Sequence, residues 1–169
     1  MIIAVRHIAT KYNTQDLLQG KIDSSIIKTI DKSEIKENLK SISSFKVDEI
    51  FSSPLKRAIE TCELYGFSNP TISNLLTEYD FGQYELTPKQ DFIDQHPEWI
   101  NNFTKTNVGE GYDSFSNRVN LFLSYLDANK NYLIFSHGVV IRYLVTVSKR
   151  MSKDQTNKLI IENNSLNFI

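Results

Sequence analysis

The sequence has little cysteine: Cys62 is the single one among 169 residues. One cysteine excludes an internal disulfide, so the fold must depend on its hydrophobic core. A chain of this length can bury such a core without crosslinks. Cys62 falls in an apolar, helix-like stretch, which favours a buried structural thiol over a reactive one.

The sequence also lacks an apolar run of the ~20 residues that a membrane-spanning helix needs. Its N-terminus has neither the basic start nor the apolar stretch of a secretion signal, so we expect a cytoplasmic protein. Lysine and arginine number 19 and aspartate and glutamate 20, which gives a net charge of −1. This balance gives no reason to expect a nucleic acid or a membrane as partner, and any positive field must be confined to a pocket.

Short apolar runs alternate with helical patterns along the chain, without an internal repeat or a flexible linker. We expect strands at 2–5, 47–51, 71–73, 132–135 and 165–169, and helices at 32–43, from Ser53 to about Tyr65, from about Asp113, at 139–148 and near 152–160. This alternation predicts one α/β domain over residues 1–169, with three α/β/α layers and a mainly parallel central sheet. The acidic and aromatic residues 86–108 are expected to form a small covering segment at one end of the sheet.

Polar clusters follow three of these predicted strands. Arg6 and His7 follow the first, residues 52–57 include Arg57 after the second, and residues 136–138 include His137 after the fourth. Because the carboxyl ends of parallel strands share one edge of a sheet, these side chains should converge there. The planar guanidinium fork matches phosphate oxygens, so the pattern predicts a phosphate-binding pocket.

The two histidines suit different roles in phosphoryl transfer. A phosphoryl acceptor must present an unprotonated ring nitrogen, and nearby arginine charges disfavour the imidazolium form. A second histidine can donate a hydrogen bond to a phosphoryl oxygen. A leaving alkoxide also needs a proton, and a carboxyl group beside aromatic rings can supply one. The residues alone leave open whether Glu78, Asp80 or Glu85 is that donor.

Five segments resemble, in the same order, the motifs of the histidine phosphatase (phosphoglycerate mutase-like) superfamily. They are Arg6-His7 with Thr10 and Asn13, residues 52–61, Glu78 with Phe81-Gly82, Gly109-Glu110 with Phe115 and Arg118-Val119, and Ser136-His137-Gly138 with Ile141-Arg142. The matches span nearly the whole chain.

The resemblance implies a phosphoglycerate mutase-like fold and assigns roles by position. His7 becomes the nucleophile that is transiently phosphorylated, and Glu78 the proton donor. The implied phosphate-binding residues are Arg6, Arg57, His137 and Gly138, with Asn13 at the rim of the pocket. The family needs no metal, and the sequence shows no dedicated metal cluster, so we expect no metal and no cofactor.

Some residues depart from the family pattern or lie outside it. Ile8 stands where the family has glycine, and its branched side chain is expected to crowd the pocket or alter the turn. Residues 19–23 resemble the family's next segment, but Ile26-Ile27 and Asp31 depart from it, so a loop that faces the substrate is expected to differ. Glu110 and Arg118 are interpreted as structural, His96 as a surface residue and Trp99 as a packing residue.

Together these features predict a phosphomonoester hydrolase that acts through a phosphohistidine on a small phosphorylated metabolite. It would be a metal-independent phosphomonoesterase of the histidine acid phosphatase type. A mutase is the alternative within the family, although only 30 residues, 79–108, separate Glu78 from Gly109 and leave little chain for larger covering segments. An alternative of another class is a non-catalytic protein that binds a phosphorylated ligand. α-Ribazole phosphate is a guess at the substrate, and the oligomeric state stays open.

Overall fold

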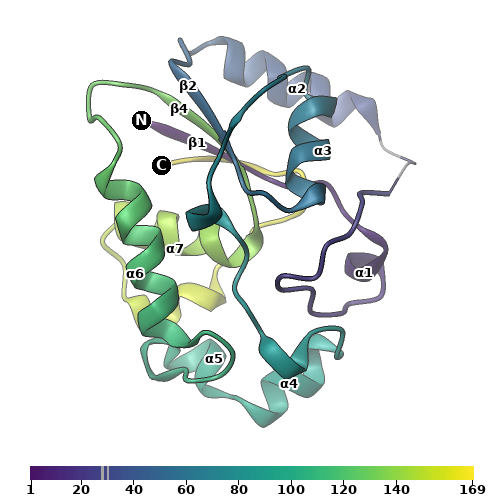
Figure 1. Cartoon of the computed structure of the whole chain (residues 1–169), viewed down its shortest axis with the longest axis vertical. Helices are drawn as coiled ribbons and strands as arrows, with labels where there is room; N and C mark the ends of the chain where they lie inside the picture. Colours follow the sequence, from purple (N-terminus) through teal and green to yellow (C-terminus); the bar gives the residue numbers. More distant parts are fainter. Residues whose placement is uncertain (28, 30) are drawn as a thin grey trace.

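A five-stranded sheet lies at the centre of the computed structural model, which describes residues 1–27, 29 and 31–169 (Figure 1). The strands are β1 (Ile2–Arg6), β2 (Glu49–Ser52), β3 (Thr71–Ile72), β4 (Tyr132–Ser136) and β5 (Leu166–Phe168). Their order is β3-β2-β4-β1-β5. The first four are parallel to their neighbours, and β5 pairs antiparallel with β1. The prediction of a mainly parallel sheet is confirmed.

Seven α-helices and four 3-10 helices connect these strands in the described part of the chain. The α-helices are α1 (Lys11–Thr14), α2 (Lys32–Ser43), α3 (Lys56–Leu64), α4 (Lys89–Gln95), α5 (Glu98–Asn101), α6 (Gly111–Ser124) and α7 (Gly138–Ser148). The 3-10 helices are η1 (Asn74–Leu76), η2 (Gly82–Tyr84), η3 (Phe103–Lys105) and η4 (Lys153–Lys158). The helix predicted near 152–160 is present as the 3-10 helix η4.

The predicted start of the third helix is wrong. The Ser53-Pro54 pair suggests a cap, but α3 begins three residues after Ser53, at Lys56, and Leu55 has extended backbone at its N-cap. The hydroxyl of Ser53 accepts a hydrogen bond from the Leu55 amide and also contacts His137. Ser53 is therefore used by the loop between β2 and α3 rather than by the helix.

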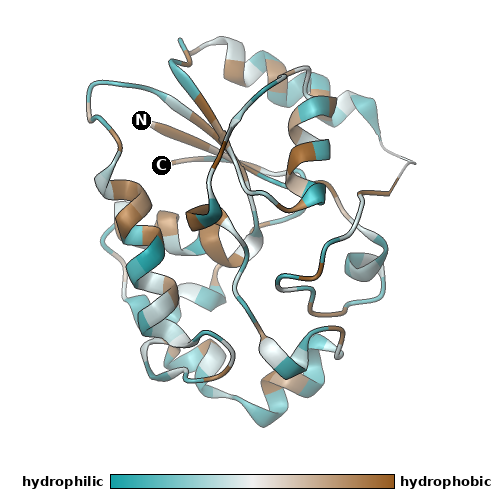
Figure 2. Cartoon of the chain, in the orientation of Figure 1, coloured by the Kyte–Doolittle hydropathy of each residue, from teal (hydrophilic) through white to brown (hydrophobic). Residues whose placement is uncertain are grey.

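Alternate residues of the central strands face two separate hydrophobic clusters, which gives the three layers. The central strands are mostly hydrophobic in colour (Figure 2). Ile3 and Val5 of β1 pack with residues of α2 and α3, whereas Ala4 packs with residues of α6 and α7. The period of two that a strand requires thus divides the core between the faces of the sheet. Cys62 is buried in the α2–α3 cluster, as predicted, and burial raises the pKa of its thiol to about 11.

α7 is almost wholly enclosed, which explains why residues 139–148 are apolar on all sides. It follows β4 directly, so its first residue lies at the carboxyl edge of the sheet. The helix predicted for this segment is confirmed. α4 and α5 lie together beyond the end of the sheet, at the bottom of the view in Figure 1.

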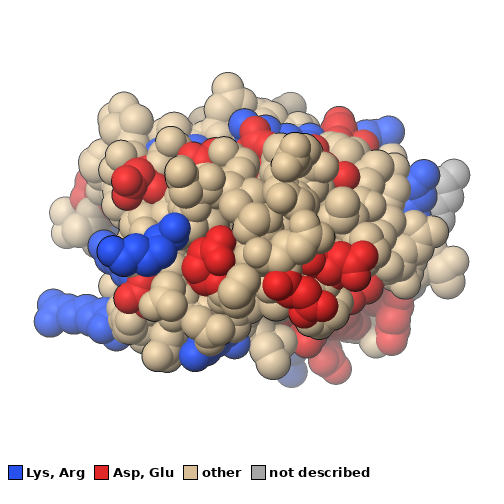
Figure 3. Space-filling model, turned by 90° about the horizontal axis from the view of Figure 1, so that it is seen from below, with Lys and Arg blue, Asp and Glu red and all other residues tan. Residues whose placement is uncertain are grey.

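The surface carries no dominant charge on the face that bears α4 and α5. Seen from that end, acidic and basic side chains form separate small groups among larger neutral areas (Figure 3). Among the described residues, no helix is long and apolar enough to cross a membrane.

Candidate active site

His7 follows β1 directly and is only 3% exposed. Its Nδ1 lies 2.7 Å from the carbonyl oxygen of Ile8, which fixes Nδ1 as the protonated nitrogen and leaves the lone pair on Nε2. Burial and the charges of Arg57 and Arg6 hold the pKa of His7 well below its ordinary value. The ring is therefore neutral at physiological pH, with a nucleophilic nitrogen available.

His137 follows β4 and lies beside His7, with ring centroids 5.2 Å apart and an interplanar angle of 56°. Its Nε2 is 2.7 Å from the hydroxyl oxygen of Ser53. Its Nδ1 is buried and has no partner in the described part of the protein. Burial, followed by the charge of Arg57, lowers the pKa of His137 well below its usual range. The structure therefore brings together the two histidines that sequence analysis singles out.

Arg57 is in the first turn of α3 and is almost fully buried. Its two terminal amino groups donate to the carbonyl oxygens of Ile22 and Gly20, each at 2.7 Å. Arg6, the last residue of β1, donates from Nη1 to the carbonyl oxygen of Ile161 at 2.5 Å. The Nε of each arginine is buried without a partner among the described residues. Each guanidinium is thus anchored by carbonyl oxygens and keeps free N–H groups for an anion.

Burial lowers the pKa of both arginines to about 10. For Arg6, the neighbouring charge of Arg142 lowers the pKa further, while Glu78 opposes this change. Both arginines are therefore cations at neutral pH, and the nearby Glu78 raises the pKa of each of them.

Glu78 is the carboxylate that the structure places beside this cationic cluster. One oxygen accepts a hydrogen bond from the Tyr79 amide at 2.9 Å, and the other from the Val139 amide, at the start of α7, at 3.3 Å. Of the three carboxylates that sequence analysis leaves open, Glu78 lines the cavity. Asp80 instead pairs with Lys21, and Glu85 accepts from the Lys21 amide.

These groups line a cavity of about 270 Å³. Its polar and glycine residues are Arg6, His7, Asn13, Gln19, Gly20, Arg57, Glu78, Lys89, Gly138, Arg142 and Asn157. Its apolar residues are Leu17, Leu18, Phe81, Phe92, Ile93, Trp99, Ile100 and Val139. Asn13 and Gly138 thus lie where the resemblance implies. His137 is fully buried and contacts His7 rather than the open space.

Arg142 is a third arginine of the cavity that the sequence analysis names only as part of a motif. Its Nε is buried without a partner in the described part of the chain, and burial lowers its pKa. It lies four residues after Gly138 on α7, so both residues share the helix face that meets the cavity. The four-residue spacing between Gly138 and Arg142 is therefore a sequence signal that points to Arg142 as a cavity residue. Lys89 and Asn157 were missed because no motif marks them.

The expectations about Ile8, Trp99 and His96 can be compared with the structure. Ile8 does not crowd the cavity: its side chain is 4% exposed and belongs to the α2–α3 cluster, while its amide donates to Thr61 Oγ1. The hydrophobic core therefore accommodates the isoleucine that stands where the family has glycine. Trp99 packs in the core as expected, but it also lines the cavity. His96 packs on the Tyr84 ring, with a side chain that is 19% exposed, and it does not line the cavity.

A match to a family model shows which family the chain belongs to. Residues 2–169 match the model of the histidine phosphatase superfamily (branch 1). The chain belongs to this superfamily. The five-motif resemblance is therefore confirmed as a family relationship.

Relatives among the histidine phosphatases are similar over most of their length. The adenosylcobalamin/alpha-ribazole phosphatase of Salmonella typhimurium is 30% identical, covering 83% of this chain and 75% of that protein. The broad-specificity phosphatase YOR283W of Saccharomyces cerevisiae is 28% identical, covering 99% and 78%.

Solved structures of other proteins share the fold. Rv3214 of Mycobacterium tuberculosis superposes with a TM-score of 0.81 at 20% identity, covering 98% of this chain and 88% of that one. TTHB049 of Thermus thermophilus superposes with a TM-score of 0.72 at 30% identity, covering 85% and 81%. The predicted phosphoglycerate mutase-like architecture is confirmed.

Proposed function

We propose that the protein is a phosphomonoester hydrolase that works through a phosphohistidine at His7. The observation that carries the proposal is the neutral His7 ring, whose Nδ1 is held by the Ile8 carbonyl in a cavity that also contains three arginines and Glu78. Arg6, Arg57 and Arg142 supply positive charge for a phosphate, and Nε2 of His7 supplies the lone pair that attacks it.

The reaction proceeds in two balanced steps. Nε2 of His7 attacks phosphorus, the ester P–O bond breaks, and Glu78, which enters this step as the protonated carboxylic acid, donates its proton to the leaving oxygen. Water then attacks the phosphohistidine, the P–N bond breaks, and Glu78 takes up a proton from the water. His137 lies beside His7, so once the phosphoryl group is on His7 the unpartnered Nδ1 of His137 donates to one of its oxygens. Asn13 and Gly138, which line the cavity, contact the phosphate. No metal or cofactor takes part.

The substrate in this proposal is a small phosphorylated metabolite. A cavity of about 270 Å³ suits a compact molecule, and its apolar side suits a leaving group with some apolar surface. The names of two relatives, an alpha-ribazole phosphatase and a broad-specificity phosphatase, are consistent with this class. We further propose that residues 1–169 act as one domain in which the segment 86–108 covers the site. A screen of phosphorylated metabolites for released phosphate identifies the substrate.

The intermediate can be trapped directly. Wild-type protein mixed with ³²P-labelled p-nitrophenyl phosphate and quenched within milliseconds should carry label that is lost in acid and retained in alkali. His7→Ala should carry none, and a chelator should leave turnover unchanged. Isomerisation of phosphoglycerate without phosphate release would instead identify a mutase. Absence of turnover from pH 4 to 8, with unchanged phosphate binding by His7→Ala, would identify a binding protein.

A further inference from the structure

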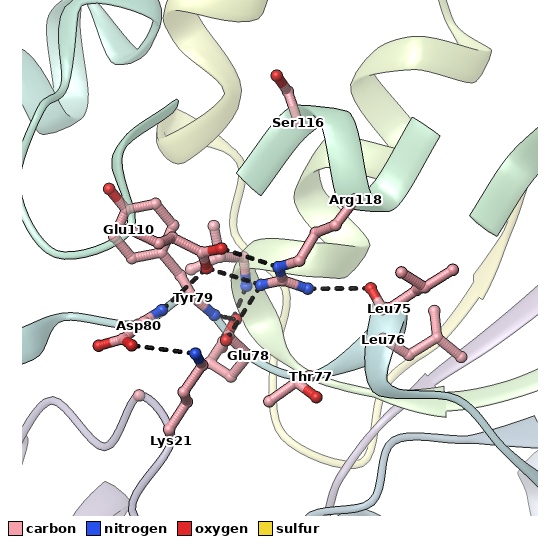
Figure 4. A network of polar contacts seen from close by, with 12 residues as sticks. Lys21, Leu75, Leu76, Thr77, Glu78, Tyr79, Asp80, Glu110, Ser116 and Arg118 are labelled. Carbon is pink, nitrogen blue, oxygen red and sulfur yellow. Dashed lines mark hydrogen bonds and ion pairs between the residues drawn. The ribbon is translucent and has the colours of Figure 1, made fainter. Parts of the chain in front are cut away.

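A partly buried ion pair outside the cavity holds the segment that carries Glu78 (Figure 4). Arg118 of α6 donates from Nε and Nη2 to the two carboxylate oxygens of Glu110, at 2.8 and 2.7 Å. The two side chains are only 17% and 12% exposed. This fork-on-fork geometry fixes the plane of the guanidinium as well as its charge.

The same guanidinium also donates to the backbone on both sides of the segment. Nη1 of Arg118 donates to the carbonyl oxygen of Leu75 at 2.9 Å, and Nη2 donates to that of Glu78 at 3.1 Å. Glu110 adds a further contact, because its Oε1 accepts from the amide of Asp80 at 3.0 Å. Residues 75–80 are therefore fixed at three backbone positions by one ion pair, as the dashed lines of Figure 4 show.

Arg118 itself has little freedom to move. Its guanidinium lies over the ring of Phe115, one helical turn earlier, at 5.0 Å from the ring centroid. It does not line the cavity, so it does not touch a bound substrate. The charge of Arg118 contributes to the lowered pKa of His137, but its hydrogen bonds reach the site only through the backbone that it holds.

The carboxylate of Glu78 depends on that backbone for its position. Both of its hydrogen bonds come from main-chain amides, of Tyr79 at 2.9 Å and of Val139 at 3.3 Å. A shift of the Glu78 carbonyl would therefore carry the carboxylate away from the leaving oxygen. A displacement of about 1 Å at a reacting group can cost roughly 100-fold in rate.

We propose that Arg118, braced by Glu110, is a positioning residue for the proton donor of this enzyme. It places Glu78 for leaving-group protonation without contacting the substrate. This inference rests on the proposed function, in which Glu78 supplies that proton. A purely structural ion pair would lower stability and would affect all substrates alike, whereas a positioning residue matters most where the leaving oxygen needs a proton.

The test uses a series of phosphomonoesters whose leaving groups range from 2,4-dinitrophenol to an alkyl alcohol. kcat/KM reports the step in which the ester bond breaks, and dinitrophenolate leaves without protonation. Arg118→Lys keeps the charge opposite Glu110 but loses the planar fork, so it cannot hold both carbonyl oxygens and the carboxylate. We expect kcat/KM to fall roughly 100-fold for the alkyl ester. The value for the dinitrophenyl ester and inhibition by inorganic phosphate should stay close to wild type.

Two further variants separate the possible failures. Glu78→Gln should show the same dependence on leaving group, more strongly, and its absence would overturn the proposed role of Glu78. If Glu78→Gln shows this dependence while Arg118→Lys affects all esters equally, the positioning role of Arg118 is wrong. Glu110→Gln, which keeps the shape of the side chain, should shift the series in the same direction and serves if Arg118→Lys does not fold. Lys21→Met is the matched control, because it removes an exposed cation that pairs with Asp80 at 3.0 Å.

Discussion

The charged floor of the cavity and its apolar wall are built in different ways. The floor comprises Arg6, His7, Arg57 and Glu78, and the wall comprises Phe81, Phe92, Ile93, Trp99 and Ile100. The floor consists of charged groups at the ends of strands and the starts of helices, and its arginines are anchored by main-chain carbonyl oxygens. Arg57, for example, is held by Gly20 and Ile22, which belong to a loop far from it in sequence. Such hydrogen bonds are directional, so a small error in position loses them altogether.

The wall is held by contacts between rings rather than by hydrogen bonds. Trp99 of α5 lies 4.8 Å from Tyr79, 5.1 Å from Phe103 and 5.5 Å from Phe92, measured between ring centroids. Apolar packing is non-directional and tolerates changes of shape better than a hydrogen-bonded charge does. The reacting groups therefore lie on the floor, where hydrogen bonds fix them, and contacts that fit the substrate come from the wall, whose apolar packing is more adaptable.

The sharpest way to break this comparison is to remove the nucleophile from the floor. His7→Asn should lower kcat by a factor on the order of 10⁵, because no other group can form the intermediate. The measurement is steady-state hydrolysis of p-nitrophenyl phosphate. His96→Asn is the matched control, since His96 packs on Tyr84 and does not line the cavity. Comparable losses in the two variants would contradict the assignment.

A subtler change on the floor tests whether geometry or charge matters there. Arg57→Lys keeps the positive charge but cannot donate to both Gly20 and Ile22 while binding phosphate, so kcat/KM should fall by about 10² to 10³. Lys56→Met removes an exposed cation from the same turn of α3 and should leave kcat/KM unchanged. Full activity of Arg57→Lys would mean that charge alone is sufficient.

The buried histidines should also make the free energy of unfolding depend on pH, whereas the apolar side chains of the wall do not titrate. In the unfolded chain the imidazoles of His7 and His137 take up protons near pH 6.5, whereas burial keeps them neutral in the folded protein to lower pH. Lowering the pH below about 6.5 therefore favours the unfolded state, by about 1.4 kcal/mol per pH unit for each histidine. Urea denaturation at pH 7, 6 and 5 measures this slope.

His137→Asn should reduce that slope by about half, since one of the two titrating groups is gone. Ile93→Ala, a wall variant, should keep the slope of the wild type. A free energy of unfolding that does not change from pH 7 to pH 5 would show that the two rings are not held neutral.

The smallest effect is expected in the wall. Ile93→Ala removes apolar surface beside the leaving group, so kcat/KM for an aryl monoester should fall roughly 5- to 10-fold. The value for glycerol phosphate should change little, because glycerol offers little apolar surface to the wall. Leu121→Ala, on an exposed position of α6, is the control. An equal fall of kcat/KM for both substrates would mean that the wall holds the reacting groups in position rather than contacting the leaving group.

The sequence predicts the floor well because local rules place it. Apolar runs of five residues or so read as strands, and the polar residues that follow Val5, Phe51 and Phe135 must then share one edge of the sheet. The residues of the cavity outside the floor were not predictable in this way. Asn157 reaches the cavity on η4, which packs against α5, and Lys89 reaches it from the first position of α4. No short-range pattern encodes either placement.

Errors in the prediction have a physical reason in each case. Ser53 carries the residue type of a helix cap, but its hydroxyl is engaged by His137 and the Leu55 amide, so the cap was misplaced. Ile8 was expected to crowd the pocket because glycine at this position eases close approach of the backbone. Its side chain instead enters the α2–α3 cluster, on the face away from the cavity.

The close approach of Asp80 and Glu110 has a consequence for how this scaffold can vary. The Glu110 amide donates to the Asp80 carbonyl at 3.0 Å, so the two ends of the segment 81–108 lie close together. Gly109 makes this crossing possible, because a Cβ there would lie 1.8 Å from the same carbonyl oxygen. A stretch whose ends already meet can be exchanged for a shorter or longer one at a small entropic cost, provided that it still covers Tyr79. Grafting residues 81–108 from another member of the superfamily should therefore transfer substrate preference while the reacting groups stay in place.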